Sequence, residues 1–346
     1  MDSPFDFNLP ATGKNFIGRK NNVESMTECI TTCTNVAIAA PDGSGKMSLI
    51  RHSVLLLKAK GTNVTVVEVD CIGIQTEQEF CGRISASCSE PFPDEDTPQD
   101  CVSAADAIGI PFAISASTGK QILVVFREFH VLDGLGTRIF REINDRLAGL
   151  EGSARCSCAF LGSSTNAMKE IFTVRKDFHR TTRTITLERI DEKEIVEHVA
   201  RGFQYSGKVI EKKDILEGCR VFDNRMSYMN QFIWYCDSMS KGYITDYLVR
   251  EAMSMVMGLN EGRFMRMMED LTDYQKSLLR AIVEGKRKLC AADVIEDYGL
   301  NSSANVKRLK EALCRKEIIT FDSKDAPRVQ DPLFEHWVKS RYFNIR

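Results

Sequence analysis

Short apolar runs alternate with amphipathic segments along the first 190 residues of the chain. The apolar runs cover residues 35–40, 63–70, 121–126, 156–162 and 183–190. The segments near 46–60, 75–88, 135–150 and 165–173 place apolar residues at helical spacing. Because helices separate the strands, the strands are expected to run parallel, with helices on both faces. The pattern predicts an α/β domain built on a five-stranded parallel sheet.

The strand pattern ends after residue 190. Residues 191–257 have the spacing of consecutive helices. Methionines between residues 253 and 268 recur at helical spacing, which is more typical of an ordinary core than of an adaptable binding groove. The pattern predicts an all-α domain after the sheet.

A third pattern begins near residue 270. Helices are expected over 272–285, 291–299 and 305–317, followed by two short strands around a turn at 323–327. Three helices and a hairpin are typical of a winged helix-turn-helix. We therefore expect three domains, which cover residues 1–190, 191–268 and 269–346.

The composition narrows the class of protein. The chain has 346 residues, of which 43% are hydrophobic and 27% charged, and its formal net charge is −2. This balance predicts a globular protein and excludes a globally basic nucleic-acid binder, although a local basic patch is compatible with it. No apolar run reaches about 18 residues, and the first ten residues lack the features of a signal peptide. We expect no membrane contact and a cytoplasmic protein.

The cysteines and an acidic segment could suggest a metal or disulfide site and a docking site, but a structural role is favoured for both. The twelve cysteines are scattered, without a CxxC pair and without histidines at ligand spacing, so inert thiols in a reducing compartment are expected. The acidic, proline-rich residues 91–100 are expected to form a solvated surface loop, with an acidic docking segment as the alternative.

The strongest chemical signal is a loop between the first strand and the helix after it. The dipeptide Gly-Lys occurs five times, but only the copy at 45–46 follows an apolar strand and opens an amphipathic helix. Glycines let backbone N–H groups curl around a phosphate, the helix N-terminus faces the anion, and a lysine adds positive charge. The alternative is a plain strand-to-helix turn. The candidate phosphate-binding residues are Pro41, Asp42, Gly43, Ser44, Gly45 and Lys46.

The match to GxxxxGK[ST] is incomplete in ways that concern magnesium. Ala40 stands at the first glycine, and Met47 stands where a hydroxyl residue binds Mg²⁺. A thioether is a poor ligand for this hard cation. Ser48 comes next, but one residue turns a helix by about 100°, so its hydroxyl should point elsewhere.

The third strand ends in a second unusual pair. Glu128 could polarise an attacking water, or it could be a strand-end carboxylate with no catalytic role. Arg127 stands where a metal-associated aspartate is expected. Two unit charges 4 Å apart interact by about 4 kcal/mol at an effective dielectric of 20, so Arg127 would repel a divalent cation unless it turns away. Its guanidinium could instead bind phosphate directly.

In this order the motifs resemble the archaeal-type P-loop ATPases of the STAND/AAA+ group. FIGRKNNVE at 16–24 is similar to the family's motif before the first strand, and APDGSGKMS at 40–48 is similar to its phosphate loop. VVFREFH at 124–130 resembles the Walker B strand, and FLGSS at 160–164 resembles the end of the sensor strand. DNRMSYMNQF at 223–232 aligns with the segment that carries Gly-x-Pro, and 307–338 resembles the closing winged helix.

The resemblance implies a P-loop NTPase fold with a helical lid, bound ATP or ADP, and a nucleotide-dependent switch. It places Gly18 and Arg19 near the adenine and extends the nucleotide site to Met47 and Ser48. Met47 replaces the hydroxyl residue, Arg127 the aspartate and Met226 the proline, so magnesium-dependent hydrolysis carries over poorly.

The predicted winged helix has a modest positive charge. Residues 301–328 contain three more basic than acidic residues, and Lys307, Arg308 and Lys310 lie on the predicted recognition helix. This is compatible with weak DNA contact, but winged helices also serve as protein-packing modules.

The sequence thus favours an ATP-binding, AAA+/STAND-type switch with weak or absent hydrolysis, and with a protein partner or self-association. Two alternatives stay open: a catalytically inactive scaffold for protein partners, and a DNA-binding regulator that uses the winged helix.

Overall fold

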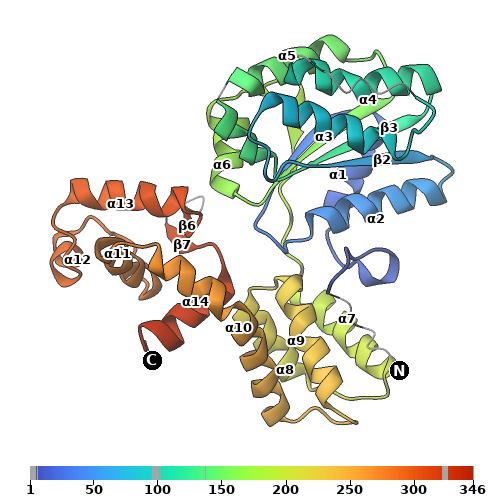
Figure 1. The fold of residues 1–346 in the computed structure, drawn as a ribbon. Coiled ribbons are helices and arrows are strands. Elements are labelled where there is room, and N and C mark those ends of the chain that lie inside the picture. Colours follow the sequence, from blue (N-terminus) through green and yellow to red (C-terminus); the bar gives the residue numbers. More distant parts are fainter. Residues whose placement is uncertain are drawn as a thin grey trace. The chain divides into compact units, whose positions relative to one another are not determined.

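The computed structural model describes residues 5, 7–95, 101, 103–136, 138–321 and 326–345. These residues separate into two compact units (Figure 1). The sheet unit contains residues 10–189. The helical unit contains residues 190–345 together with Phe5 and residues 7–9. The three-domain division of the sequence analysis stays a prediction.

The sheet unit contains a five-stranded parallel sheet within the described residues, with the strand order β2-β3-β4-β1-β5. Its strands are β1 (Asn35–Ala39), β2 (Val64–Asp70), β3 (Gln121–Arg127), β4 (Cys156–Gly162) and β5 (Thr182–Thr184). Its helices are α1 (Lys20–Thr31), α2 (Lys46–Ala59), α3 (Glu77–Ser89), α4 (Ala104–Thr118), α5 (Arg138–Leu150) and α6 (Thr165–Lys169). The short turns η1 (Gly13–Asn15), η2 (Phe129–Leu135) and η3 (Glu170–Val174) complete it. The predicted parallel α/β sheet is confirmed.

Two apolar layers enclose the sheet, as the alternation along β3 shows. Ile122, Val124 and Phe126 pack with α3, α4 and α5, whereas Leu123 and Val125 pack with α1 and α2. Successive strand side chains point to opposite faces, so a strand buried on both faces is apolar throughout. Figure 1 shows the same layers, with α3, α4 and α5 on one side of the sheet.

The structure corrects the prediction for this unit at one missed helix and at two predicted elements. Helix α4 was not predicted, because it is apolar on nearly every side and contains Pro111, so it lacks an amphipathic period. The helix expected from residue 135 begins at Arg138, after the 3₁₀ turns of η2. Strand β5 has three residues instead of spanning 183–190. Beyond it, the Asn22 side chain replaces a neighbouring strand as hydrogen-bond partner: it donates to the Thr186 carbonyl and accepts from the Glu188 N–H.

The helical unit contains α7 (Glu192–Tyr205), α8 (Lys212–Phe222), α9 (Met226–Met239) and α10 (Asp246–Glu269). Helix α10 continues well past the expected end at residue 257, because Phe264 and Met268 are buried and extend its apolar contacts. Among the described helices of the chain, none is long and apolar enough to cross a bilayer.

The winged helix follows in the same unit. It comprises α11 (Asp273–Val283), α12 (Ala292–Asp297), α13 (Ser303–Arg315), β6 (Ile319–Phe321), β7 (Pro327–Val329), α14 (Pro332–Trp337) and the turn η4 (Val338–Tyr342). Strands β6 and β7 pair antiparallel, as expected for the wing. Most of the predicted turn at 323–327, and residues 96–100 of the predicted acidic loop, lie outside the described residues.

Candidate functional site

The loop from β1 to α2 has the shape of a phosphate cradle. Gly43 and Gly45 have φ of 69° and 86°, in the left-handed region where glycine is the least strained residue. Helix α2 follows with 14 residues, no side-chain cap and no acidic residue in its first turn. Its first N–H groups and its dipole are therefore available to an anion. Asp42 and Gly43 are exposed at the tip of the loop.

Lys46 lies folded against this loop. Its side chain is buried, and its ammonium donates to the carbonyl oxygens of Ala40 at 2.5 Å and Pro41 at 3.2 Å. The backbone N–H of Ser44 also donates to the Pro41 carbonyl, which closes the turn. A phosphate that enters the loop would compete with these neutral oxygens for the ammonium, and a charged acceptor makes the stronger bond.

Arg19 braces the outside of the loop. Its guanidinium donates to the Ser44 carbonyl at 2.6 Å and to the Glu188 carbonyl at 2.9 Å. Burial lowers the pKa of Arg19, and the charge of Glu188 opposes that shift. A Cβ built on Gly45 would lie 3.0 Å from the Arg19 Nη1 atom, so a larger residue at this position would require the guanidinium to shift. Gly18, with φ of 64°, turns the chain just before it.

Met47 and Ser48 are both held by packing. Met47 is half-buried and packs against the apolar layer that contains α1 and α2. The Ser48 hydroxyl accepts a hydrogen bond from the backbone N–H of Ala11 at 3.0 Å. The side chain of Met47 offers no oxygen ligand, and the Ser48 hydroxyl is oriented by its bond from Ala11.

Residues 10–16 form a strap along α2 that sequence reasoning missed. Besides Ala11, the backbone N–H of Gly13 donates to His52 Nδ1 at 3.1 Å. The rings of Phe16 and His52 stack with centroids 4.2 Å apart and an interplanar angle of 5°. Burial lowers the pKa of His52, which keeps the ring neutral and its Nδ1 an acceptor. No local pattern marks these contacts, because they join residues about 40 positions apart.

Glu128 follows β3 in a left-handed conformation, with φ of 52°. Its Oε2 atom accepts hydrogen bonds from the Ser163 hydroxyl and from the Ser163 backbone N–H, the latter at 2.9 Å. His130 Nδ1 lies 3.6 Å from the same oxygen. The carboxylate is thus fixed between the ends of β3 and β4.

Arg127 turns to a different neighbour. Its Nη1 atom lies 3.8 Å from the Asp70 carboxylate at the end of β2, which is the register partner of Arg127. Strand β4 lies between β3 and β1, so the end of β3 is two strand spacings, about 10 Å, from the start of the phosphate loop. Direct contact between Arg127 and a phosphate in that loop would require another rotamer.

The predicted recognition helix α13 presents two of its three candidate cations to solvent. Lys307 and Arg308 are exposed. Lys310 is half-buried, with its ammonium 4.4 Å from the ring centroid of Phe321 on β6. That cation–π contact ties Lys310 to the wing.

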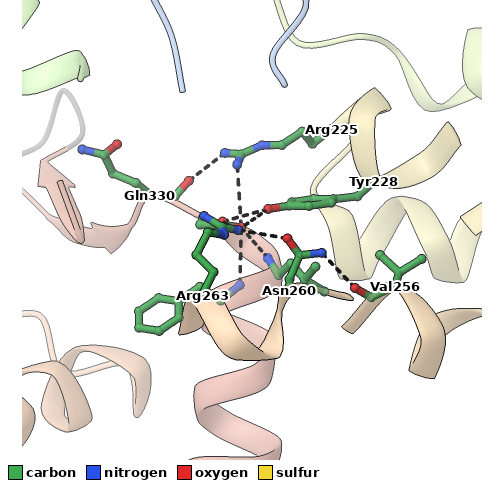
Figure 2. A network of polar contacts seen from close by, with 9 residues as sticks. Arg225, Tyr228, Val256, Asn260, Arg263 and Gln330 are labelled. Carbon is green, nitrogen blue, oxygen red and sulfur yellow. Dashed lines mark hydrogen bonds and ion pairs between the residues drawn. The ribbon is translucent and has the colours of Figure 1, made fainter. Parts of the chain in front are cut away.

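Segment 223–232 supplies a polar network inside the helical unit, shown in Figure 2. Arg225 donates to the Gln330 carbonyl at 2.8 Å and lies 3.7 Å from the Asp331 carboxylate. Tyr228 and Arg263 donate to the other oxygen of Asp331, at 2.8 and 2.7 Å. The network joins α9 and α10 to the first turn of α14.

Comparison with known proteins bears on the fold and on the winged helix. A family model described as "Probable winged helix domain" matches residues 262–340. A search by sequence among curated proteins gives no match.

Among solved structures, a Walker-type ATPase of Pyrococcus abyssi is similar with a TM-score of 0.75 and 15% identity, over 97% of this chain and 99% of that one. The ORC2 protein of Aeropyrum pernix, in ADPNP–ADP complexes, is similar with a TM-score of 0.65 and 13% identity, over 97% and 98% of the two chains. The ORC1 protein of Aeropyrum pernix, in complex with DNA, has a TM-score of 0.53 and 11% identity, over 97% and 96%. This chain therefore has the P-loop NTPase fold of archaeal Walker-type and ORC-like AAA+ structures, and it ends in a winged-helix domain.

Proposed function

We propose that the chain binds ATP or ADP at the loop of residues 41–48 and works as a nucleotide-dependent switch with weak or absent hydrolysis. One observation carries the proposal: Lys46 and the uncapped start of α2 converge on a loop shaped by two left-handed glycines. These are the groups that a phosphate needs, and they need no metal to act.

The same site is poorly suited to magnesium. Met47 replaces the oxygen ligand, the Ser48 hydroxyl accepts from Ala11, and Arg127 occupies the usual position of an acidic residue. Glu128 is the remaining acidic candidate, and Ser163 holds its carboxylate. We therefore expect phosphate charge to be neutralised by Lys46 and the loop N–H groups, with the cation contributing little.

Arg19 could transmit a change in the loop to the segment around Glu188. It bonds the carbonyl of Ser44 inside the loop and the carbonyl of Glu188, just before the sheet unit ends at Arg189. A phosphate that displaces Lys46 from Ala40 and Pro41 changes the shape of the turn that Arg19 holds. Loop occupancy would in this way bias the segment that leads into the helical unit.

The direct test is a calorimetric titration of the whole chain with ATP and with ADP, in magnesium and in EDTA. Saturable binding whose dissociation constant changes little between the two buffers supports the proposal. Binding that requires magnesium would overturn the cation-independent site. If neither nucleotide binds at millimolar concentration, the result favours the alternative of a catalytically inactive scaffold for protein partners.

A second candidate function is DNA binding through α13, favoured by the exposure of Lys307 and Arg308 and by the likeness to a structure solved with DNA. Affinity for duplex DNA would then fall with salt, and Lys307→Ala/Arg308→Ala would reduce the salt slope by roughly one for each phosphate that is no longer bound. Lys241→Ala/Arg250→Ala, which removes two exposed charges elsewhere in the helical unit, is the control. No binding at low salt would make the winged helix a packing module.

A further inference from the structure

A hollow of about 430 Å³ lies within the helical unit, between α8, β7 and the α14–η4 segment. Its volume is in the range of small-molecule sites. The charged and titratable residues that line it are Arg220, Arg328, His336, Lys339, Asp223 and Glu335. The Asp331 network fixes α14 to α9 and α10 in the same unit, so one wall of the hollow is rigid.

The lining has an excess of positive charge. Lys339 and Glu335 neutralise each other, with their charged atoms 2.5 Å apart. Arg220 is largely exposed, and its ion pair with Glu217, outside the lining, is long, with 3.9 Å between the charged atoms. Arg328 is also exposed, on the strand of the wing. Apart from the Lys339–Glu335 pair, the lining therefore holds two guanidinium groups and one carboxylate, that of Asp223.

His336 lies near several of these basic side chains. Its pKa is lowered first by burial and then by the charges of Arg220, Lys339 and Arg341, and Glu335 opposes the shift. The ring is therefore neutral near pH 7 and has one N–H to donate. His336 is half-buried beside basic side chains, of which Lys339 and Arg341 are paired with Glu335 and Glu261.

We propose that this hollow binds a phosphate group. Two guanidinium groups and a neutral imidazole suit phosphate oxygens, because planar forks bond them in pairs. Val221, Val329 and Pro332 add apolar surface for the remainder of the ligand. The phosphate can come from a small phosphorylated molecule or from a nucleic-acid backbone. Either ligand would bridge α8 to the wing. The proposal does not depend on nucleotide binding at the loop of residues 41–48.

Histidine NMR of the whole chain tests it, because the sequence has only five histidines. Inorganic phosphate is added at constant ionic strength, with chloride as the balancing anion. We expect a saturable shift of the His336 signal, which His336→Gln identifies. The His52 signal reports separately on α2 beside the phosphate loop, so failure of one site is distinguishable from failure of the other.

A pair of matched variants locates the site. Arg220→Gln/Arg328→Gln should raise the phosphate concentration at half-saturation by roughly tenfold or more, the effect of losing charge-assisted hydrogen bonds. Arg250→Gln/Arg287→Gln removes two exposed charges elsewhere in the unit and should leave it within about twofold. Both pairs are on the surface, and unchanged thermal unfolding confirms the fold. A shift that stays linear, or that both variants weaken equally, overturns the proposal.

The source of the phosphate is settled by adding a short DNA duplex to the same sample. If the duplex shifts the His336 signal and phosphate reverses that shift, the hollow takes a nucleic-acid backbone. If the duplex leaves His336 unchanged while phosphate still saturates it, the ligand is a small phosphorylated molecule. No response to either ligand contradicts the site.

Discussion

The backbone N–H of Ser163 donates a 2.9 Å hydrogen bond to the Oε2 atom of Glu128, and the Ser163 hydroxyl bonds the same oxygen. The two residues lie at the ends of the adjacent strands β4 and β3. The two bonds hold this oxygen of the carboxylate in place. Ser163 thus fixes Glu128 through Oε2, and any water that Glu128 polarises would be bound most directly by its other oxygen.

Hydrolysis should be very slow in this chain and recoverable by restoring the metal ligands. We expect ATP turnover far below about 1 s⁻¹, which lies in the ordinary enzyme range. Met47→Thr with Arg127→Asp should raise magnesium-dependent phosphate release, because it supplies two oxygen ligands and removes a cation. The control Met47→Leu with Arg127→Lys supplies neither and should gain nothing. Wild-type turnover at about 1 s⁻¹ or faster would refute this account.

Lys46 should contribute one charge-assisted bond to nucleotide affinity. Lys46→Ala is expected to weaken ATP binding by about 1.5–3 kcal/mol, a roughly ten- to hundredfold rise in the dissociation constant. Lys58→Ala removes an exposed lysine near the other end of the same helix and should change affinity little. Calorimetry in EDTA measures both. Equal affinities for Lys46→Ala and wild type would place the nucleotide elsewhere.

Asp331 should be a main determinant of stability in the helical unit. One carboxylate oxygen caps α14 through the N–H groups of Leu333 and Phe334, and the other accepts from Tyr228 and Arg263. Asp331→Ala removes the acceptor for all four donors and should lower the free energy of unfolding by roughly 2–4 kcal/mol. Asp331→Asn keeps a cap and should cost less in urea unfolding. If both variants unfold like wild type, the network does not stabilise the unit.

The effect of Gly202→Ala on stability should change sign when Phe5 is removed. A Cβ built on Gly202 would lie 2.3 Å from the buried Phe5 ring, which also packs on Phe203. Gly202→Ala should therefore destabilise the wild-type chain. Phe5→Ala should lower the free energy of unfolding by about 1.5–3 kcal/mol, because it removes buried apolar surface. In the Phe5→Ala background, Gly202→Ala should instead stabilise by roughly 0.5–1 kcal/mol, because alanine is the better helix residue.

A double-mutant cycle by chemical denaturation measures this coupling. Additive effects would show that the Phe5 ring does not occupy the space above Gly202 in solution.

Thiol reactivity should follow burial. Eight of the twelve cysteines are buried, and Cys290 is exposed. Burial raises the pKa of Cys88 and of Cys236 to about 12, so at pH 8 almost none of either thiol is the reactive thiolate. Limited alkylation followed by mass spectrometry should find Cys290 first and the buried thiols only after unfolding. Early labelling of Cys88 would contradict the packing of α3.

The apolar strands, the turn before α2 and the winged helix were predictable because local sequence patterns encode each of them. An apolar run such as 121–126 is buried on both faces, and Gly43 and Gly45 allow the left-handed conformations that the turn before α2 requires. The predicted sheet, its helical layers and the winged helix are accordingly confirmed.

Only the tertiary structure decided which groups meet. Helix α4 escaped prediction because burial on nearly all sides erases the amphipathic period. The partners of Ser48, Arg127 and Asp331 are Ala11, Asp70 and the pair Tyr228 and Arg263, at separations of 37 to 103 residues. Strand order and helix packing bring such residues together, and no local pattern records those contacts. The sequence by itself thus determined the parts of the site, whereas the fold determined which of its polar groups are already engaged.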